Sequence, residues 1–170
     1  MISLGGVALG GAALGLLAMD RVAVRLIKPP LKPLRKRVAD LPFSSERILV
    51  RSGSVDLSGW LAQPRDDNGG PVLILVHGWG SNHGTMARLG EPLLEKGFPV
   101  FLFDVRHHGE SGGAPYVTAR HFRDDITAAV RSVLVWCPDR SRVLIGHSMG
   151  GATGVLAVAD GAPVDAFVSI

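Results

Sequence analysis

Three short, unbroken runs of apolar residues set the fold class of this chain. They are VLILV at 72–76, VFLF at 100–103 and VLI at 143–145. A strand reads this way when helices cover both faces of its sheet, because no position along it then meets water. The three runs therefore predict the central strands of a mostly parallel sheet.

Helical and hairpin patterns lie around these runs. After Thr118, an expected N-cap, apolar residues recur at helical spacing at Phe122, Ile126, Val130, Val133 and Leu134. Residues 86–94 suggest another helix, which Pro92 should kink or split. Residues 48–51 and 55–62 read as an antiparallel hairpin. The expected architecture is an α/β sheet with right-handed crossovers and helices on both faces.

The last elements of the chain are a predicted helix at 150–159 and a further apolar strand at 166–170. A doubly wound domain does not normally finish on such a strand, because its unpaired edge is prone to association. We therefore expect a fragment of a longer protein, truncated after about six strands.

An uncharged segment, residues 2–19, opens the chain. As a helix it would measure about 27 Å, close to the hydrocarbon thickness of a bilayer. No Lys or Arg precedes it, and Leu16 spoils the best cleavage site, so it lacks the pattern of a cleavable signal peptide. We expect residues 1–20 to be an uncleaved transmembrane helix, with a signal peptide as the alternative.

Seven Lys and Arg residues follow within 21–37. By the positive-inside tendency they hold the globular part in the cytoplasm, which predicts a single-pass membrane protein. Prolines make residues 21–45 a stiff basic linker. We expect residues 2–37 to contact membrane lipids and residues 46–170 to form the globular domain.

Charge and cysteine content exclude several classes of function. Residues 38–170 hold eleven bases and fourteen acids, so they lack the concentrated basic face that nucleic-acid binding requires. The single cysteine, Cys137, excludes an internal disulfide framework, and no Cys/His spacing resembles a zinc site. We expect no metal, no cofactor and no nucleic-acid partner.

A Gly-x-Ser-x-Gly pattern spans Gly146 to Gly150, between a predicted strand and a predicted helix. Serine is a poor nucleophile that must be exposed and reachable by a base, and a sharp strand-to-helix turn provides the exposure only if its flanking residues are small. The pattern therefore predicts Ser148 as a catalytic nucleophile. The alternative is an ordinary glycine-rich helix entry with the serine as its cap.

A second motif, His77-Gly78-Trp79-Gly80, follows the first apolar run. Such a loop can bring a backbone amide to the same side of the sheet as the serine. Acyl transfer requires two donors for the oxygen that becomes negative, and we expect these to be the amides of Trp79 and Met149. The alternative is that the loop only turns the strand end and that Trp79 only packs.

Residues 46–170 resemble the N-terminal part of the α/β-hydrolase fold, of the lysophospholipase and serine aminopeptidase S33 kind. Three motifs carry the resemblance in the same order: His-Gly-x-Gly at 77–80, Asp-Val-Arg-His-His-Gly-Glu-Ser at 104–111, and Gly-His-Ser-Met-Gly-Gly at 146–151. The second motif departs from the family pattern, which usually has glycine where this chain has His107. The resemblance implies the same nucleophile, Ser148, and the same oxyanion residues, Trp79 and Met149.

The partners that such a serine requires are missing from this sequence. On this fold an acid and then a histidine follow the nucleophile. No histidine follows Ser148, and the only later acids, Asp160 and Asp165, come too early in the fold to fill the acid position. We therefore expect the isolated chain to be inactive.

The histidines that are present have other expected roles. We expect His147 to pack beside the serine turn and His77 to be structural. The pair His107 and His108 lies where ligands bind in open sheets, whereas His83 and His121 are expected to face solvent. Asp104 should fix the loop that follows it, with Arg106 as a possible ion-pair partner.

These features together predict a membrane-anchored serine hydrolase. It would act on carboxylic esters, lipid or acylglycerol-like, through an acyl-enzyme on Ser148. Its partners would be a small-molecule ester or amide substrate and membrane lipids. The alternatives are a serine peptidase of the S33 type and a non-catalytic membrane-anchored binding protein that uses the same fold.

Overall fold

The computed structural model describes residues 19, 21–22, 28–113 and 116–170. The expected transmembrane helix over residues 1–20 falls outside this part of the chain, except for Met19. Within the described residues, no helix combines the length and the apolar character needed to cross a bilayer.

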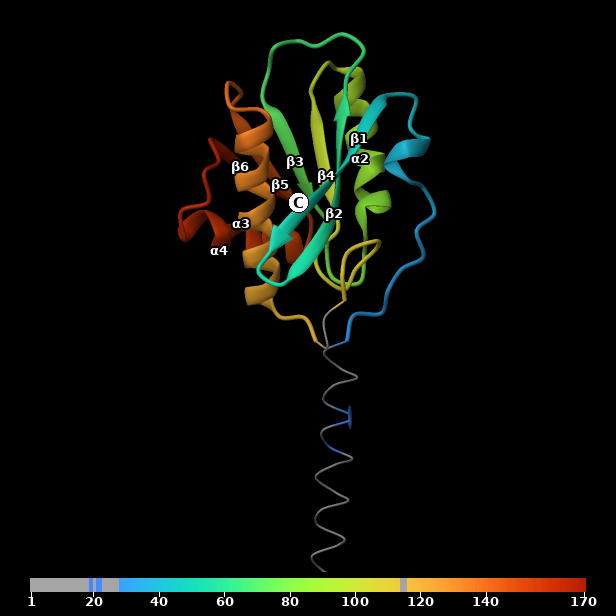
Figure 1. Cartoon of the computed structure of the whole chain (residues 1–170), viewed down its shortest axis with the longest axis vertical. Helices are drawn as coiled ribbons and strands as arrows, with labels where there is room; N and C mark the ends of the chain where they lie inside the picture. The colour runs from blue at the N-terminus through green and yellow to red at the C-terminus, as the bar shows by residue number, and fades with distance from the viewer. Residues whose placement is uncertain (1–18, 20, 23–27, 114–115) are drawn as a thin grey trace, which may run out of the picture.

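Six strands form one sheet in the order β1-β2-β4-β3-β5-β6 (Figure 1). The strands are β1 Ser44–Ser52, β2 Val55–Gln63, β3 Val72–Val76, β4 Val100–Phe103, β5 Arg142–Gly146 and β6 Ala166–Ser169. The β1–β2 hairpin is antiparallel, and β2 runs antiparallel to β4. The pairs β3–β4, β3–β5 and β5–β6 are parallel. The predicted hairpin and the predicted parallel centre are both confirmed.

Three helices cover the sheet on its two faces (Figure 1): α2 His83–Glu95 on one, and α3 Ala119–Trp136 with α4 Met149–Ala159 on the other. Alternate residues of β3 pack into the cores on the two faces of the sheet. Ile74 belongs to the core that α3 and α4 share, whereas Leu73 and Leu75 belong to the core under α2. All of β3 and β4 is buried, because both faces are covered.

Two sequence signals concerned the helices: a cap at Thr118 and a break at Pro92. The side chain of Thr118 accepts a hydrogen bond from the His121 amide at 3.3 Å and caps α3, as predicted. Of the two outcomes predicted for Pro92, the split of α2 is wrong, since one helix runs through it; the kink stays a prediction. Proline removes the amide that would donate to the carbonyl of Arg88, and its ring crowds that carbonyl; because Arg88 is exposed, water can take the place of the lost donor.

Residues 28–43, which we call the strap, pack against the domain and lead into β1. The short 3-10 helix η1, Val38–Asp40, lies within it. Val38 and Leu41 are buried in the same core as Trp60 of β2. A segment that reads in sequence as a basic linker is therefore part of the packed structure over this length.

Candidate active site

Ser148 lies on the turn between β5 and α4, at the carboxyl end of the parallel strands. Its side chain is exposed, and its backbone has φ 54° and ψ −116°, a region that residues with a β-carbon rarely occupy. Three hydrogen bonds hold the turn: the His147 amide donates to the Val76 carbonyl at 2.9 Å, the Ser148 amide to Ile170 at 2.8 Å, and the Gly150 amide to His147 at 2.9 Å. The strained conformation is thus fixed from both sides.

The two glycines of the motif are required by close backbone contacts. A β-carbon on Gly150 would lie 2.6 Å from the His77 carbonyl oxygen and 2.8 Å from that of Val76. A β-carbon on Gly146 would collide with the backbone of Gly150. Any larger residue would force β3, β5 and α4 apart at the point where the serine is presented.

The loop that follows β3 lies directly beside this turn. A β-carbon on Gly78 would be 3.1 Å from the Ser148 β-carbon and 3.4 Å from Nδ1 of His147. Among the described residues, the amides of Trp79 and Met149 donate to no other group. The indole of Trp79 stacks on Phe122, with ring centroids 6.1 Å apart and planes inclined by 22°, so this residue packs through its side chain and leaves its amide unpaired within the described part.

Two buried histidines hold the neighbouring loops in place. Nδ1 of His77 donates to the Gly78 carbonyl at 2.8 Å, and Nε2 accepts from the Val105 amide at 3.1 Å. Burial is the main cause that lowers the pKa of His77 to about 4, so its ring is neutral at pH 7. His77 is structural, as predicted.

His108 holds the loop at Gly80 and the loop at Arg106 in the same way. Its Nε2 accepts from the Gly80 amide at 3.0 Å, and its Nδ1 donates to the Arg106 carbonyl at 2.8 Å. Burial lowers the pKa of His108. Both ring nitrogens are engaged, and the ring is 1% exposed, so this histidine fixes the loops instead of lining an open site.

Asp104 is fully buried and organises the loop after β4, as expected. It accepts from the His83 amide at 2.6 Å, from His83 Nδ1 at 2.8 Å and from the Glu110 amide at 2.8 Å. The prediction that His83 faces solvent is therefore wrong: its ring is buried against Trp60, 3.9 Å between centroids. Sequence analysis missed this pairing, and the only available signal was that a carboxylate at the end of a buried strand needs donors.

The expected pairing of Arg106 with Asp104 is also wrong. Arg106 pairs with Asp125 of α3, 2.6 Å from Nη2 to the carboxylate, and its amide donates to the same group at 2.8 Å. This pair ties the loop to α3 because the Asp125 carboxylate is fully buried and requires a cation. His121, also expected to face solvent, is half-buried with its ring beside Tyr116.

The departure from the family pattern at His107 has a structural counterpart. This residue has φ 60°, the left-handed region that glycine adopts without strain. Its amide donates to the Gly112 carbonyl at 2.8 Å. His147 is exposed beside Ser148, with its ring nitrogen over Gly78, as expected of a residue that packs beside the turn.

The two acids that follow Ser148 lie away from it. Asp160 is at the end of α4, about 18 Å along the helix from the serine, where it pairs with Arg123 at 2.8 Å. Asp165 accepts from the Arg142 amide at 2.7 Å, at the opposite end of β5. Within the described residues, no cluster of three or more His, Cys, Asp or Glu side chains could hold a metal ion.

A family profile, curated proteins and solved structures are similar to this chain. The family profile described as serine aminopeptidase, S33, matches residues 69–170. Monoglyceride lipase of Rattus norvegicus is 33% identical over 91 residues, 52% of this chain and 30% of the lipase. The sn-1-specific diacylglycerol lipase of Xenopus tropicalis is 32% identical over 103 residues, 59% of this chain and 31% of that protein.

Among solved structures, an esterase from Pyrococcus furiosus superimposes with a TM-score of 0.73 at 25% identity. The match covers 84% of this chain and 56% of the esterase. The chain thus spans about 30% of the length of the two curated lipases.

Proposed function

Because this chain belongs to the serine aminopeptidase S33 family of α/β-hydrolases, we propose that it carries the nucleophile part of a membrane-anchored serine hydrolase that cleaves carboxylic esters. The observation that carries the proposal is the turn at Ser148. An exposed hydroxyl stands on a strained strand-to-helix turn beside the 77–80 loop. Relatives named as lipases and an esterase support esters as the substrate class.

The proposed reaction begins with attack of the Ser148 hydroxyl oxygen on the ester carbonyl. A general base takes the hydroxyl proton, the carbonyl oxygen becomes negative, and the alcohol leaves with a proton to give an acyl-enzyme that water hydrolyses. The amides of Trp79 and Met149 would hold the negative oxygen. Each such donor stabilises the transition state by about 3 kcal/mol, and the N-terminus of α4 adds a favourable dipole.

The general base and its supporting acid are not assigned to any residue of this chain. No histidine follows Ser148 in the sequence, and the later acids are engaged in ion pairs at other sites. Since the chain spans about 30% of the length of the curated lipases, we propose that both groups belong to a longer protein. The 170-residue chain by itself would then turn over no ester.

Two other functions are alternatives, of which the first has specific support. The family description itself names an aminopeptidase, and the same acyl-enzyme chemistry serves amides, so a serine peptidase is the second candidate. Without a base, the isolated chain could also act as a binding protein that uses this fold.

The anchor is a proposal on the sequence alone. Residues 1–20, with the seven bases that follow, would place a single helix in the membrane and the hydrolase domain in the cytoplasm. Protease protection of a C-terminal tag in right-side-out and inverted vesicles tests it. A tag cleaved from outside right-side-out vesicles would contradict this orientation.

A fluorophosphonate probe tests the nucleophile. It should label the longest natural product of the gene and should fail to label Ser148→Ala. The matched control is Ser54→Ala, which removes an exposed hydroxyl from the hairpin turn and should label normally. A folded long product that resists labelling would favour the binding role, and ester hydrolysis by the 170-residue chain that Ser148→Ala abolishes would refute the proposed need for a longer protein.

A further inference from the structure

The strap lies across the 77–80 loop and the start of α2. The Lys32 amide donates to the Gly80 carbonyl at 2.7 Å, and the side-chain amide of Asn82 donates to the Lys32 carbonyl at 2.9 Å. Gly80 has φ 69°, and a β-carbon there would lie 2.6 Å from the Pro30 carbonyl oxygen. The strap is therefore a fixed wall beside the loop that carries Trp79.

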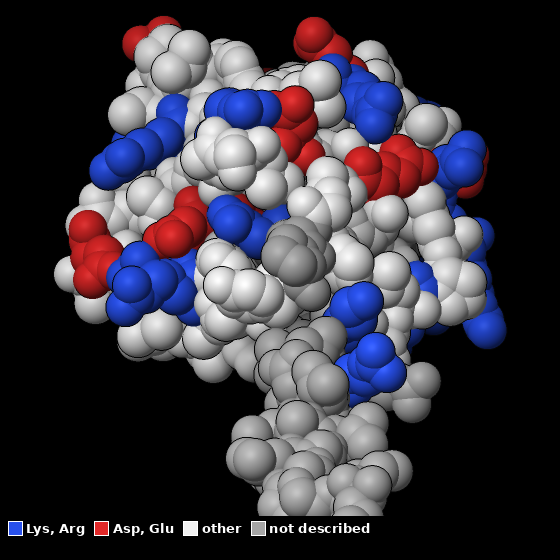
Figure 2. All heavy atoms as spheres, turned by 60° about the horizontal axis from the view of Figure 1, so that its bottom comes forward, with Lys and Arg blue, Asp and Glu red and all other residues white. Residues whose placement is uncertain are grey.

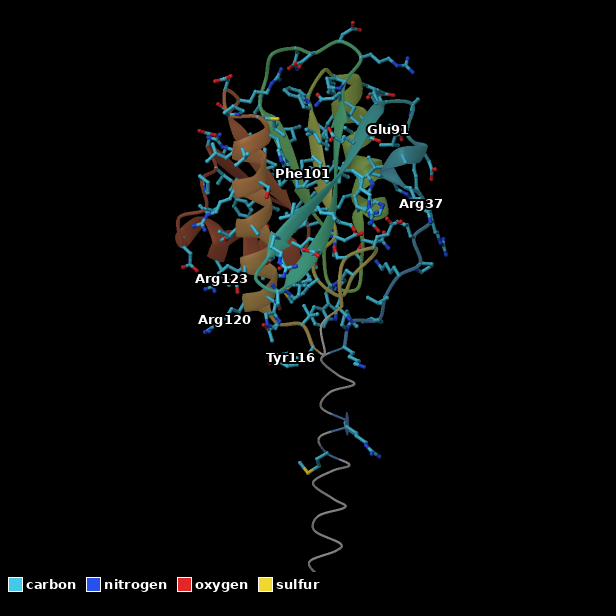
Figure 3. All side chains as sticks on the ribbon, viewed as in Figure 1. Arg37, Glu91, Phe101, Tyr116, Arg120 and Arg123 are labelled. Atoms are coloured by element: carbon cyan, nitrogen blue, oxygen red, sulfur yellow. The ribbon has the colours of Figure 1, made fainter. Side chains whose placement is uncertain are left out.

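A groove of about 420 Å³ runs between the strap and α2. Its lining combines four cations with small or neutral groups and contains no acid: Lys32, Pro33, Arg35, Lys36, Asn82, Gly84, Thr85 and Arg88. Figure 2 shows basic side chains on both sides of this face of the molecule, and Figure 3 shows Arg37 of the strap and Glu91 of α2 on the same side.

The cations of this groove are largely uncompensated. Lys36 pairs with Glu91 at 2.6 Å. Among the described residues, Lys32, Arg35 and Arg88 pair with no acid. Three neighbouring positive charges repel one another, and the N-terminus of α2 adds to the positive potential. A bound anion would relieve this repulsion.

A second groove shows the opposite arrangement. It has a volume of about 850 Å³ and also contains four arginines. Three of them are matched by acids: Arg51 by Asp56, Arg106 by Asp125, and Arg123 by Asp124 and Asp160. Of these two grooves, the one along the strap is therefore the one that combines several unpaired cations with a lack of acids.

We propose that the strap groove binds the phosphate of an anionic phospholipid headgroup. Lysine and arginine are the side chains that recognise phosphate oxygens. The lipid is favoured over a free phosphate because Lys32 lies twelve residues after the proposed anchor ends at residue 20. The inference rests on that anchor. A headgroup held here would bring the bilayer surface to the loop beside Ser148, since Lys32 is bonded to Gly80.

Calorimetric titration of the full chain in neutral detergent micelles tests the groove. The titrants are dihexanoyl phosphatidylglycerol, dihexanoyl phosphatidylcholine and inorganic phosphate. We expect phosphatidylglycerol to bind more tightly than the other two. The Lys32→Gln/Arg88→Gln variant, which changes two exposed side chains, should weaken that binding roughly 30-fold.

The matched control is Arg120→Gln/Arg131→Gln, which removes the same charge from α3. Arg120 lies on the other side of the molecule from Arg37 (Figure 3). Equal binding of phosphate and phosphatidylglycerol would overturn the lipid assignment. Equal weakening in both double variants, or none in either, would overturn the groove. The micelle titration requires neither bilayer insertion nor catalysis, so its failure is distinct from failure of the anchor or of Ser148 labelling.

Discussion

Acidification should destabilise this fold through His77, because its ring is buried in the neutral form. Its Nε2 accepts from the Val105 amide at 3.1 Å, and a proton on that nitrogen would break the bond. The pKa of His77 is lowered to about 4, chiefly by burial, whereas in the unfolded chain it returns to about 6.5.

The sign and size of the effect follow from these two values. As the pH falls below 6.5 the unfolded chain takes up the proton first, so the free energy of unfolding decreases until the folded ring titrates near pH 4. The difference between the two pKa values corresponds to about 3 kcal/mol, of which about 2 kcal/mol is lost between pH 7 and pH 5. Burial lowers the pKa of His108 as well, which adds a loss of the same sign.

Urea unfolding of the full chain in neutral detergent, followed by tryptophan fluorescence at pH 7, 6 and 5, measures the loss. In His77→Gln the decrease between pH 7 and pH 5 should be about 2 kcal/mol smaller. The control His147→Gln removes an exposed ring and should keep the wild-type dependence.

A direct NMR titration covers the case in which His77→Gln does not fold. The ring signal of His77 in the wild-type chain should stay that of a neutral imidazole down to about pH 4. A midpoint near pH 6.5 would refute the reasoning, because the buried bonds would then impose no penalty on the charged ring.

Further substitutions test the turn at Ser148 and the ion pair between Arg106 and Asp125. Gly150→Ala places a β-carbon 2.6 Å from the His77 carbonyl oxygen and should lower the free energy of unfolding by about 2 kcal/mol in urea titrations; an unchanged midpoint would contradict the contact. Asp125→Asn leaves Arg106, 12% exposed, without its counter-charge and should cost about 3 kcal/mol. Asp124→Asn, which removes a more exposed carboxylate of the same helix, should cost far less, and equal losses would refute the assignment.

The central strands could be predicted from sequence because their environment is uniform. Val72–Val76 and Val100–Phe103 coincide with β3 and β4, since both faces are covered and every position is apolar. β5 is one residue longer at each end than the predicted 143–145, where Arg142 and Gly146 interrupt the apolar run. The exposed position of Ser148 also followed from its place between a strand and a helix.

The contacts that sequence patterns did not predict join residues far apart in the chain. His83 sits among polar residues and reads as exposed, yet it pairs with Asp104, which lies 21 positions later. The strap has no hydrophobic periodicity, so its packing depends on Val38 and Leu41 meeting Trp60. Such pairings are fixed by the tertiary fold and leave no local signature. The roles of Trp79 and Met149 stay predictions.

The docked strap also limits how the domain could move at a membrane. A flexible linker lets the attached domain rotate and move over a radius that grows with linker length. Here the chain is bonded to the domain at Lys32, and the twelve residue steps from the end of the proposed anchor at residue 20 to Lys32 can reach at most about 40 Å when fully extended. With the proposed anchor in a bilayer, the domain would therefore stay within this distance of the lipid surface.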